Sequence, residues 1–408
     1  MGEALQVLDQ KGPAAAQHSD PVTVWRAADD LLAAREQWSA VPWRTFEADL
    51  DVFLAVVDAR PEAIRPHVIA VERDGRVAAA LVLRLERVPL STSVGYATLY
   101  SPRVRSLTLV HGGEYAEDAE AARLVLDELE RSLGRGEADV AQFPSLPVDS
   151  LFFGLASSRW SRARRQHFAE SRPHHRMTLP ESVDVLLAGR SRKTRYNLKR
   201  SADMLEDAVP DLSLELLRDP ADFELIMRDL ERVAAKTYQR ALGAGFADVE
   251  YQRRLVRLAL ERGWLRAWLL RDGDEPIAFW LGFVHRRTFF SSSTGYDPAY
   301  AKHGLGTYLH LRLLRDLCAD PAVDALDYGL GDADYKRRFA DTTWLESDAV
   351  IYAPRPRGMQ VSLARNGILL ADRLARRTLE RFGLTQRVKR LWRTRLRRGQ
   401  PQAGERRG

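Results

Sequence analysis

Apolar residues in the first half of the chain follow a helical period first and then a strand-like pattern. Residues 21–60 place apolar side chains at spacings of three and four, which predicts helices. Two apolar runs then flank Asp74-Gly75, a dipeptide that favours tight hairpin turns. A strand over 106–111, a helix at about 116–133 and a strand over 139–143 follow. This order predicts a unit in which helices flank a sheet, an α/β fold.

The second half repeats this order of elements. Its predicted elements are helices at about 221–239 and 248–262, strands at 264–271, 276–284 and 288–296, a helix that opens at Gly304, a strand at 325–330, a short helix, and a strand at 344–353. The turn Asp272-Gly273 lies 198 residues after Asp74-Gly75, and both turns separate paired apolar runs. We therefore interpret the chain as a duplicated α/β unit.

Composition fits a globular protein with two domains. The chain has 408 residues, 45% hydrophobic and 29% charged, which is long for a single core. Its one cysteine, Cys318, excludes an intramolecular disulfide and fits a reducing compartment; late in an apolar helix, it is expected to be core. No apolar run approaches the roughly 18 residues of a spanning helix, and the start lacks a signal-peptide pattern. We expect a cytoplasmic protein.

Positive charge is concentrated at the end of the chain. Residues 355–408 contain 16 Arg and Lys residues but 3 Asp and Glu residues, although the net charge of the whole chain is only +6. Within 385–398 the apolar residues share one helical face. Such a helix can lie on an anionic membrane or an acidic protein surface. A solvated tail is the alternative, and nucleic acid is not expected because no recognised binding motif accompanies the charge.

A loop with two glycines opens the helix that begins near Gly304. Backbone amides at a helix N-terminus hold phosphate anions, so residues 303–307 are candidates for binding a phosphorylated cofactor, with Lys302 adding charge. The alternative is that Gly304 and Gly306 only allow a tight entry into a buried helix. The strand that follows ends in Gly-x-Gly-Asp-x-x-Tyr-Lys, with Asp332, Tyr335 and Lys336 just beyond it. Strand ends of this kind are where α/β proteins keep their chemistry.

The sequence resembles the GCN5-related N-acetyltransferase (GNAT) superfamily, and within it the tandem-domain CelD-like and BioF-like acetyltransferases, relatives of Fem-type transferases. The residues that carry the resemblance are Ser191–Arg200, Gly295-Tyr296-Asp297-Pro298, Gly304-Leu305-Gly306-Thr307, Asp327-Tyr328-Gly329-Leu330-Gly331-Asp332, Tyr335-Lys336 and Phe339. The usual phosphate loop has Arg or Gln where this chain has Ala301, with Lys302 and His303 beside it. In the first half, Gly112-Gly113 is followed by the anion Glu114. We therefore expect the first domain to have lost cofactor binding.

The resemblance implies two GNAT-like domains, each a mixed, mostly antiparallel sheet with flanking helices. The expected divisions are a disordered start at 1–20, an N-terminal domain at 21–180, a basic linker helix at 181–210, a C-terminal domain with the acyl-CoA site at 211–354, and a basic amphipathic tail at 355–408. The linker charges suit an anionic substrate or a cofactor phosphate. A solvated interdomain helix explains them as well.

The resemblance also implies roles for individual residues. Tyr335 would protonate the leaving thiolate; a tyrosine packed at a domain seam is the alternative. Asp332 would accept a proton from the amine or bind it, unless it caps the next helix. Lys336 needs a depressed pKa to act as a base, and pairing with Asp332 is the simpler reading. The expected cofactor contacts are Lys302, His303, Gly304, Leu305, Gly306 and Thr307.

Substrate contacts are expected from Tyr296, Asp297 and Tyr328. An ordinary turn stabilised by its own side chain explains Asp297 almost as well. The small hydroxyl residues 291–293 on a predicted strand leave room for a ligand, or are surface positions. His174-His175 has no partner at metal-binding spacing in the sequence, so no metal is expected.

These features predict an acyl-CoA-dependent N-acyltransferase. The donor would most simply be acetyl-CoA, and the acceptor an amine such as an amino sugar or a cell-envelope or exopolysaccharide precursor. The amine would attack directly in a ternary complex. Two alternatives stay open: a Fem-type transferase that uses aminoacyl-tRNA, and a non-catalytic scaffold of a polysaccharide biosynthesis machine. A membrane-seeking tail would make the protein membrane-peripheral.

Overall fold

The computed structural model describes residues 20–381 apart from 95–96, 168, 238–239 and 241–244. The predicted disordered residues 1–19 and the predicted amphipathic helix at 385–398 lie outside this range. Among the described helices, none combines the length and the apolar content that a bilayer crossing requires.

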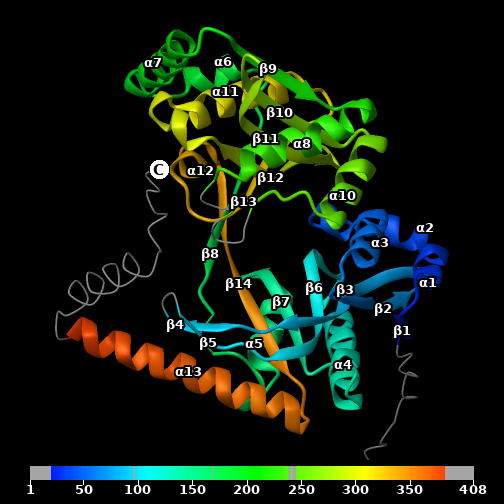
Figure 1. The fold of residues 1–408 in the computed structure, drawn as a ribbon. Helices are drawn as coiled ribbons and strands as arrows, with labels where there is room; N and C mark the ends of the chain where they lie inside the picture. Colours follow the sequence, from blue (N-terminus) through cyan, green and yellow to red (C-terminus); the bar gives the residue numbers. More distant parts are fainter. Residues whose placement is uncertain (1–19, 95–96, 168, 238–239, 241–244, 382–408) are drawn as a thin grey trace, which may run out of the picture.

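One twelve-stranded sheet runs through the whole molecule (Figure 1). Its strands in spatial order are β1 (Val22–Trp25), β2 (Ala63–Arg73), β3 (Arg76–Pro89), β6 (Arg103–Ala116), β7 (Val140–Pro147), β14 (Thr342–Tyr352), β8 (Arg172–Thr178), β13 (Ala325–Leu330), β12 (Thr288–Tyr296), β11 (Glu275–His285), β10 (Leu265–Asp272) and β9 (Leu212–Leu217). The short strands β4 (Thr92–Val94) and β5 (Ala97–Tyr100) form a separate hairpin.

The strand order confirms the predicted duplication. We call residues 22–178 the first repeat and residues 212–352 the second. Each repeat has four antiparallel strands followed by one parallel pair, β6 with β7 and β12 with β13. The last strand of each repeat crosses over: β8 pairs with β13, β14 pairs with β7, and β8 and β14 pair with each other. The sheet therefore interlocks the two repeats across the expected domain divisions.

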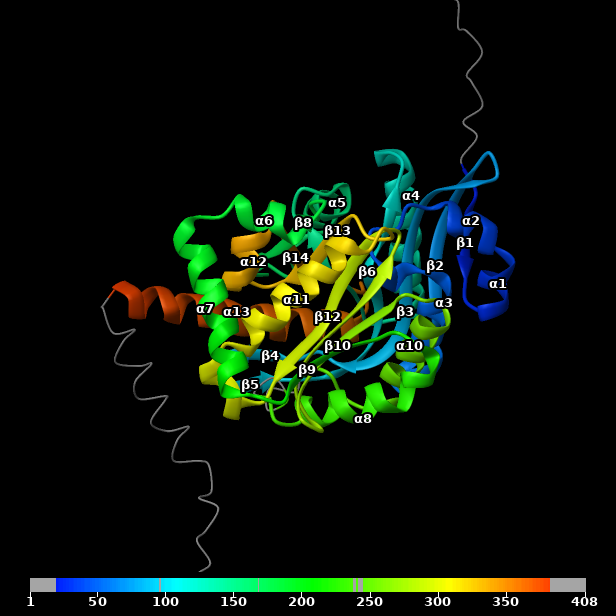
Figure 2. The same ribbon diagram turned by 90° about the horizontal axis from the view of Figure 1, so that it is seen from above.

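Helices cover both faces of the sheet. In chain order they are α1 (Ala28–Ala33), α2 (Arg35–Ala40), α3 (Leu50–Ala59), α4 (Ala119–Arg135), α5 (Leu151–Ser158), α6 (Val183–Ala188), α7 (Arg192–Ala208), α8 (Phe223–Ala234), α10 (Glu250–Glu261), α11 (Leu305–Ala319), α12 (Asp334–Phe339) and α13 (Pro356–Arg381), with 3-10 turns η1 (Phe46–Ala48), η2 (Arg162–Arg164), η3 (Pro220–Asp222) and η4 (Pro298–His303). Figure 2 shows α3 of the first repeat beside α10 of the second, where Arg254 pairs with Asp58.

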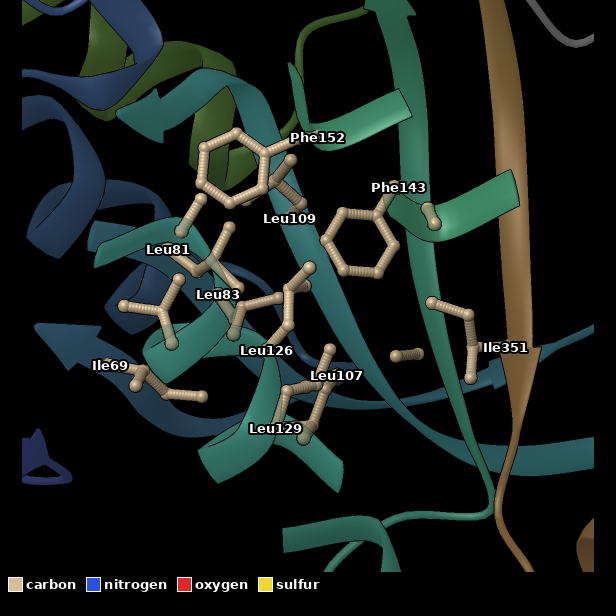
Figure 3. Close-up of a cluster of buried hydrophobic side chains, with 14 of the residues drawn as sticks. Ile69, Leu81, Leu83, Leu107, Leu109, Leu126, Leu129, Phe143, Phe152 and Ile351 are labelled. Atoms are coloured by element: carbon tan, nitrogen blue, oxygen red, sulfur yellow. The ribbon is translucent and has the colours of Figure 1, made fainter. Parts of the chain in front are cut away.

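The core of the first repeat shows how the exchanged strand takes part in packing. Leu126 and Leu129 on α4 pack over aliphatic side chains of β2, β3 and β6, and Phe143 lies on β7 (Figure 3). Ile351 of β14 joins this cluster, although it lies 208 positions after Phe143 along the chain. A strand from the second repeat therefore completes the core of the first.

Several predicted elements agree closely with the structure. Strands β12 and β13 have the limits read from the sequence. The helix that opens at Gly304 buries Leu305, Leu309, Leu313 and Leu317, so the predicted apolar face is confirmed. Cys318, expected to be core, is only partly buried, because it lies beside that face rather than on it.

Other predictions were wrong. Residues 22–25, expected to be helical, form the edge strand β1, in which Trp25 pairs with Val68. Their β-branched sequence Val-Thr-Val suits a strand, and pairing with β2 outweighs the helical spacing. The second hairpin turn is centred on Gly273-Asp274 rather than Asp272-Gly273, because Asp272 still pairs with Glu275.

The start of the expected tail belongs to the folded body. On α13, Val361 and Ser362 are buried, and the Ser362 hydroxyl donates to the Ala163 carbonyl oxygen at 2.6 Å. Arg365 is also buried and donates to Thr92 Oγ1 in the β4–β5 hairpin at 2.9 Å. The helix then runs past that hairpin in Figure 1. A boundary at 355 therefore cuts through packed structure, since the first turns of α13 hold the first repeat.

Candidate active site

The two parallel strands of the second repeat separate along their length. Strands β12 and β13 pair only over Thr288–Phe290 and Ala325–Asp327. On the other side of β12, Leu281 pairs with Ser293 and Gly282 with Ser291, so Ser292 forms a β-bulge. A bulge bends its strand and interrupts the ladder of backbone hydrogen bonds. The sheet therefore opens into a V, with irregular backbone facing the gap.

A cavity of 560 Å³ lies over this opening. Its lining comes from α7, β11, β12, the start of α11 and α12: Leu198, Trp280, Thr294, Gly295, Tyr296, Ala301, Gly304, Leu305, Gly306, Thr307, His310, Ala333, Asp334, Tyr335, Arg338 and Phe339. Six predicted site residues are thus brought together: Tyr296, Gly304, Leu305, Gly306, Thr307 and Tyr335. Lys302 and His303 lie on the adjacent turn η4, outside the described lining.

The first turn of α11 opens onto this cavity without a side-chain cap. Gly304 is the N-cap residue with φ +72°, a left-handed conformation that favours glycine. A Cβ there would lie 2.2 Å from Ser201 Oγ on α7, so no larger residue fits. At Gly306 the space for a Cβ is open. The amides of Thr307 and Tyr308 already donate to the Gly304 carbonyl oxygen, which leaves Leu305 and Gly306 as the amides suited to an anion.

The end of β13 is shaped by two glycines and a buried lysine. Gly329 and Gly331 have φ values of +69° and +100°. The Lys336 ammonium donates to the carbonyl oxygens of Gly329 at 3.3 Å and Leu330 at 2.6 Å. Burial lowers the pKa of Lys336 to about 8, although Asp327 opposes the shift. The expected Lys336–Asp332 pair is therefore absent among the described contacts, because the lysine side chain turns back under the strand end.

Asp332 lies at the exposed edge of this region. It pairs with Arg337 and lies 4.0 Å from His175 Nε2. The residue that precedes α12 is Ala333, and no side chain caps that helix. The capping role considered for Asp332 was therefore wrong, since the helix begins one residue later than capping by Asp332 requires.

Tyr335 lies among three other aromatic rings at the cavity. Its ring meets those of Trp280, His310 and Tyr328 edge-on, at centroid distances of 5.7, 5.3 and 5.7 Å. His310 is stacked on Trp280 at 5.3 Å, and burial lowers the pKa of His310 to about 3. The imidazole is therefore neutral and contributes no charge to the cavity. These packed rings fix the direction of Tyr335.

Tyr328 lies behind the aromatic residues that line the cavity. Its side chain is buried, and its hydroxyl lies 2.8 Å from His310 Nε2 and donates to Met177 Sδ at 3.7 Å. Burial raises the pKa of Tyr328, so the phenol stays protonated. Tyr328, from which a substrate contact was expected, does not line the cavity itself and adjoins it through His310 and Tyr335.

Asp297 is engaged away from the cavity. Its carboxylate accepts the Ala299 amide at 2.9 Å and pairs with the Lys236 ammonium at 2.7 Å. Burial raises the pKa of Asp297, but Lys236 and the Ala299 amide outweigh it and hold the pKa below its usual value. The turn considered as the alternative for Asp297 is confirmed. Tyr296, the residue before it, does line the cavity.

A basic groove of 270 Å³ adjoins the cavity between α7 and α11. Its charged lining is Arg195, Lys199, Arg312 and Arg315, and Leu198 lines both spaces. Other linker charges face elsewhere: Arg190 donates to the Arg338 carbonyl oxygen at 2.8 Å and lies over the Phe339 ring. Only part of the basic linker therefore faces the groove.

Sequence reasoning missed Trp280, His310 and Arg338. Each lies within an apolar strand or a helix, where a single aromatic or basic residue is ordinary core or surface. Their proximity depends on the turn of α12 back over β11 and α11, which no local spacing encodes. The sequence offered one signal, the repeated order of apolar segments. It indicates which elements of the second half correspond to those of the first, but not which side chains meet.

The corresponding region of the first repeat is closed. Helix α4 begins after Asp118, whose carboxylate accepts the Ala121 amide at 2.8 Å and pairs with Arg73. Gly112 and Gly113 lie inside β6 rather than at a helix entry. Thr45 packs against Gly112 and donates to the His111 carbonyl oxygen at 2.5 Å. The amides at the start of α4 therefore have a side-chain acceptor, unlike those at the start of α11.

The fold and the matched domain define an acyltransferase of the GNAT class. Residues 192–337 match a family model described as an acetyltransferase (GNAT) domain. Residues 192–337 therefore form a domain of the GNAT superfamily, and the fold of the chain is related to that of FemX. No curated protein matches the sequence.

Two of the matching solved structures align with most of this chain. The structure of FemX aligns with a TM-score of 0.55 at 11% identity, covering 81% of this chain and 98% of that one. A tandem GNAT protein from the clavulanic acid biosynthesis pathway, solved without AcCoA, aligns with a TM-score of 0.50 at 12% identity, covering 82% and 99%. At these identities the likeness establishes the fold alone.

Proposed function

We propose that the second repeat transfers an acyl group, most simply acetyl, from coenzyme A to an amine. The observation that carries this proposal is one cavity that joins the uncapped start of α11 to Tyr335. A pyrophosphate at the amides of Leu305 and Gly306 would place the thioester arm along the opened edge of β12. Beyond Phe290, the backbone groups of that edge have no partner on β13.

The chemistry needs a polarised carbonyl, an unprotonated amine and a proton for the leaving thiolate. Backbone amides at the bulge are suited to the first task, because fixed dipoles stabilise charge that develops during the reaction. Tyr335 is suited to the last, because its hydroxyl belongs to a side chain that three other rings orient. Asp332 at the rim would attract a protonated amine, and Lys336 would hold the strand end in place. No acyl-enzyme is needed for this route.

The proposal is tested by ligand-induced stabilisation of the full chain. Acetyl-CoA should raise the melting temperature more than free coenzyme A or malonyl-CoA, because a ligand that binds only the native state stabilises it. A folded protein that shows no shift with any coenzyme A species would contradict the proposal.

A second candidate donor is aminoacyl-tRNA, as expected of a Fem-type transferase. The basic groove at Arg195, Lys199, Arg312 and Arg315 favours it, since clustered cations bind a phosphate backbone. The same groove would suit the nucleotide phosphates of coenzyme A. Gel-shift titration with charged tRNA separates the two: salt-sensitive tRNA binding without a shift by coenzyme A would favour the Fem-type donor.

We further propose an envelope-related amine acceptor and a peripheral membrane contact through residues 382–408. The support is the charge of this segment and the exposed apolar residues Leu370 and Leu374 that lead to it on α13. Truncation after Arg381 keeps the packed turns of α13 and should abolish co-sedimentation with anionic liposomes. Equal sedimentation of the full and truncated chains would refute this contact.

A further inference from the structure

Three potential metal ligands meet where the two repeats exchange strands. They are His111 on β6, His174 on β8 and Glu346 on β14. His174 Nδ1 lies 3.2 Å from Glu346 Oε1, and His111 Nε2 lies 3.4 Å from Glu346 Oε2. One ligand atom from each residue lies within 4.8 Å of the others. His174 and Glu346 are almost fully buried, at 1% and 0% exposed, while His111 is part-exposed.

Surrounding groups hold each ligand in a metal-binding orientation. His174 Nε2 lies 2.7 Å from Asp327 Oδ1, and Trp344 stacks on its ring at 4.2 Å. His111 Nδ1 faces Glu47 at 3.9 Å. A carboxylate on the far nitrogen of an imidazole fixes the tautomer that presents the near nitrogen to a metal. His174 has that hydrogen-bonded partner in Asp327, and the Glu47 carboxylate lies near the corresponding nitrogen of His111.

Glu346 is positioned in the same way. Its Oε1 atom accepts hydrogen bonds from Arg44 at 2.7 Å and from Trp344 Nε1 at 2.9 Å. The Oε2 atom is left facing His111. Since Arg44 also pairs with Glu114, its charge is shared between two carboxylates. The Glu346 carboxylate is therefore fixed through Oε1, which also lies near His174, while Oε2 faces His111.

Around these three residues, carboxylates outnumber the basic groups, and several buried polar atoms lack a hydrogen-bond partner among the described residues. Four carboxylates, from Glu47, Glu114, Asp327 and Glu346, surround a single guanidinium and two imidazoles. Three buried atoms lack a hydrogen-bond partner among the described residues: His174 Nδ1, Glu47 Oε2 and Glu114 Oε2. Buried polar atoms are rarely left unpaired, because their desolvation costs free energy. A bound divalent cation would engage Nδ1 and offset the surplus charge.

We propose that His111, His174 and Glu346 form a zinc site that joins the two repeats. Two imidazoles and a carboxylate are ligands that zinc prefers, with one position left for water. Tetrahedral ligands at about 2.0–2.1 Å from the metal lie about 3.3–3.4 Å apart, and His111 Nε2 lies 3.4 Å from Glu346 Oε2. His174 Nδ1 lies within 4.8 Å of the other ligand atoms. The open position lies on the side of part-exposed His111. The site does not depend on the proposed acyl transfer.

The zinc site would tie together strands that local sequence does not connect. Each ligand comes from a different strand, and β8 and β14 are the two that cross between repeats. Metal bound to the native protein alone adds to its free energy of unfolding. The expectation from sequence that no metal binds rested on spacing along the chain. The fold supplies the spacing that the sequence lacks.

The experiment is a zinc titration of the full chain after removal of metal with a chelator. One equivalent should bind, raise the melting temperature, and be replaceable by Co²⁺ with the visible absorption of a tetrahedral site. His174→Gln should weaken zinc binding by at least about 100-fold, and Asp327→Asn by about 10- to 100-fold. His175→Gln is the matched control, because the neighbouring side chain points to the other face of β8 and should leave binding unchanged.

His111→Asn serves as a second ligand variant, since His111 is part-exposed and its replacement threatens folding less than that of His174. Circular dichroism confirms folding for each variant. Stoichiometric zinc that is lost in both ligand variants and kept in His175→Gln supports the site. No stoichiometric zinc in the folded wild-type chain, or equal binding by His111→Asn and His175→Gln, would overturn the proposal and leave an ion-paired seam.

Discussion

The two repeats share one arrangement of strands but differ at the start of the helix after the fourth strand. In the first repeat, Asp118 caps α4 and Arg73 pairs with the cap. In the second, Gly304 precedes α11 and no side chain caps it. A carboxylate at a helix N-terminus satisfies the amides that an anionic ligand would use. One residue at this position therefore separates a self-contained helix from one that can receive a phosphate.

The spaces beside the parallel strand pairs β6–β7 and β12–β13 also differ between the two repeats. In the first repeat, Thr45 fills the space beside Gly112, and Arg44 binds Glu114 and Glu346. In the second, the corresponding opening leads to the 560 Å³ cavity. The two repeats thus share a strand order, while Thr45 from a preceding segment fills the space beside Gly112 in the first. The cavity that carries our proposed chemistry lies in the second.

The largest expected effect concerns Tyr335, which lines the 560 Å³ cavity of the second repeat. Tyr335→Phe keeps the packed ring but removes the hydroxyl, so kcat should fall by about 10²- to 10⁴-fold with little change in acetyl-CoA binding. Steady-state kinetics with the acceptor amine measure this effect. Tyr300→Phe is the control, because the Tyr300 hydroxyl donates to Asp272 outside the cavity lining. Equal kcat values for wild type and Tyr335→Phe would assign the residue to packing alone.

The next prediction concerns the lysine beneath the end of β13. Residues 148–158, which follow β7 in the first repeat, contain no lysine. Lys336 has a pKa lowered from 10.5 to about 8, so between these values the unfolded chain binds more protons than the native protein. Stability therefore rises with pH from 8 to 10.5, by about 3 kcal/mol from this residue.

Denaturant melts of Lys336→Met across this pH range measure that contribution. The free energy of unfolding of wild type, relative to Lys336→Met, should increase between pH 7 and pH 10.5. Lys199→Met, which alters an exposed lysine of α7, should follow wild type. Parallel pH profiles for wild type and Lys336→Met would contradict the lowered pKa.

A smaller effect comes from giving α11 the carboxylate that α4 already has. Gly306→Asp fits without a clash, since the space for a Cβ is open, and an acid in the first turn favours the helix. Acetyl-CoA binding should weaken by about 10- to 100-fold, a change of about 1.4–2.7 kcal/mol in binding free energy. Calorimetric titration measures it.

The isosteric Gly306→Asn variant isolates the charge. It should retain most of the binding, and Asp118→Asn in the first repeat should not change binding at all. Equal losses in the Asp and Asn variants would show that bulk, rather than charge, excludes the ligand, and the contrast between the two helix starts would then fail.

Local pattern predicted most elements of the fold. The limits of β12 and β13, the apolar face of α11 and the hairpin at Asp74-Gly75 followed from periodicity and turn chemistry. Trp25 was wrongly placed in a helix, because pairing with β2 outweighed its local spacing. The candidate site was predicted in part: Gly304, Gly306 and Tyr335 do line one cavity. Tyr328 and Asp297 were expected to contact substrate, but their side chains are engaged elsewhere.

The sequence by itself determined the repeated α/β order, the glycines that open α11 and the Tyr335-Lys336 pair beyond β13. These depend on neighbours within a few turns of backbone, so local spacing is sufficient. Only the tertiary structure decided that β8 and β14 change places, and that His111, His174 and Glu346 meet. Those contacts join residues 63 to 235 positions apart along the chain. They arise because one sheet pairs strands of both repeats, a constraint that no local pattern records.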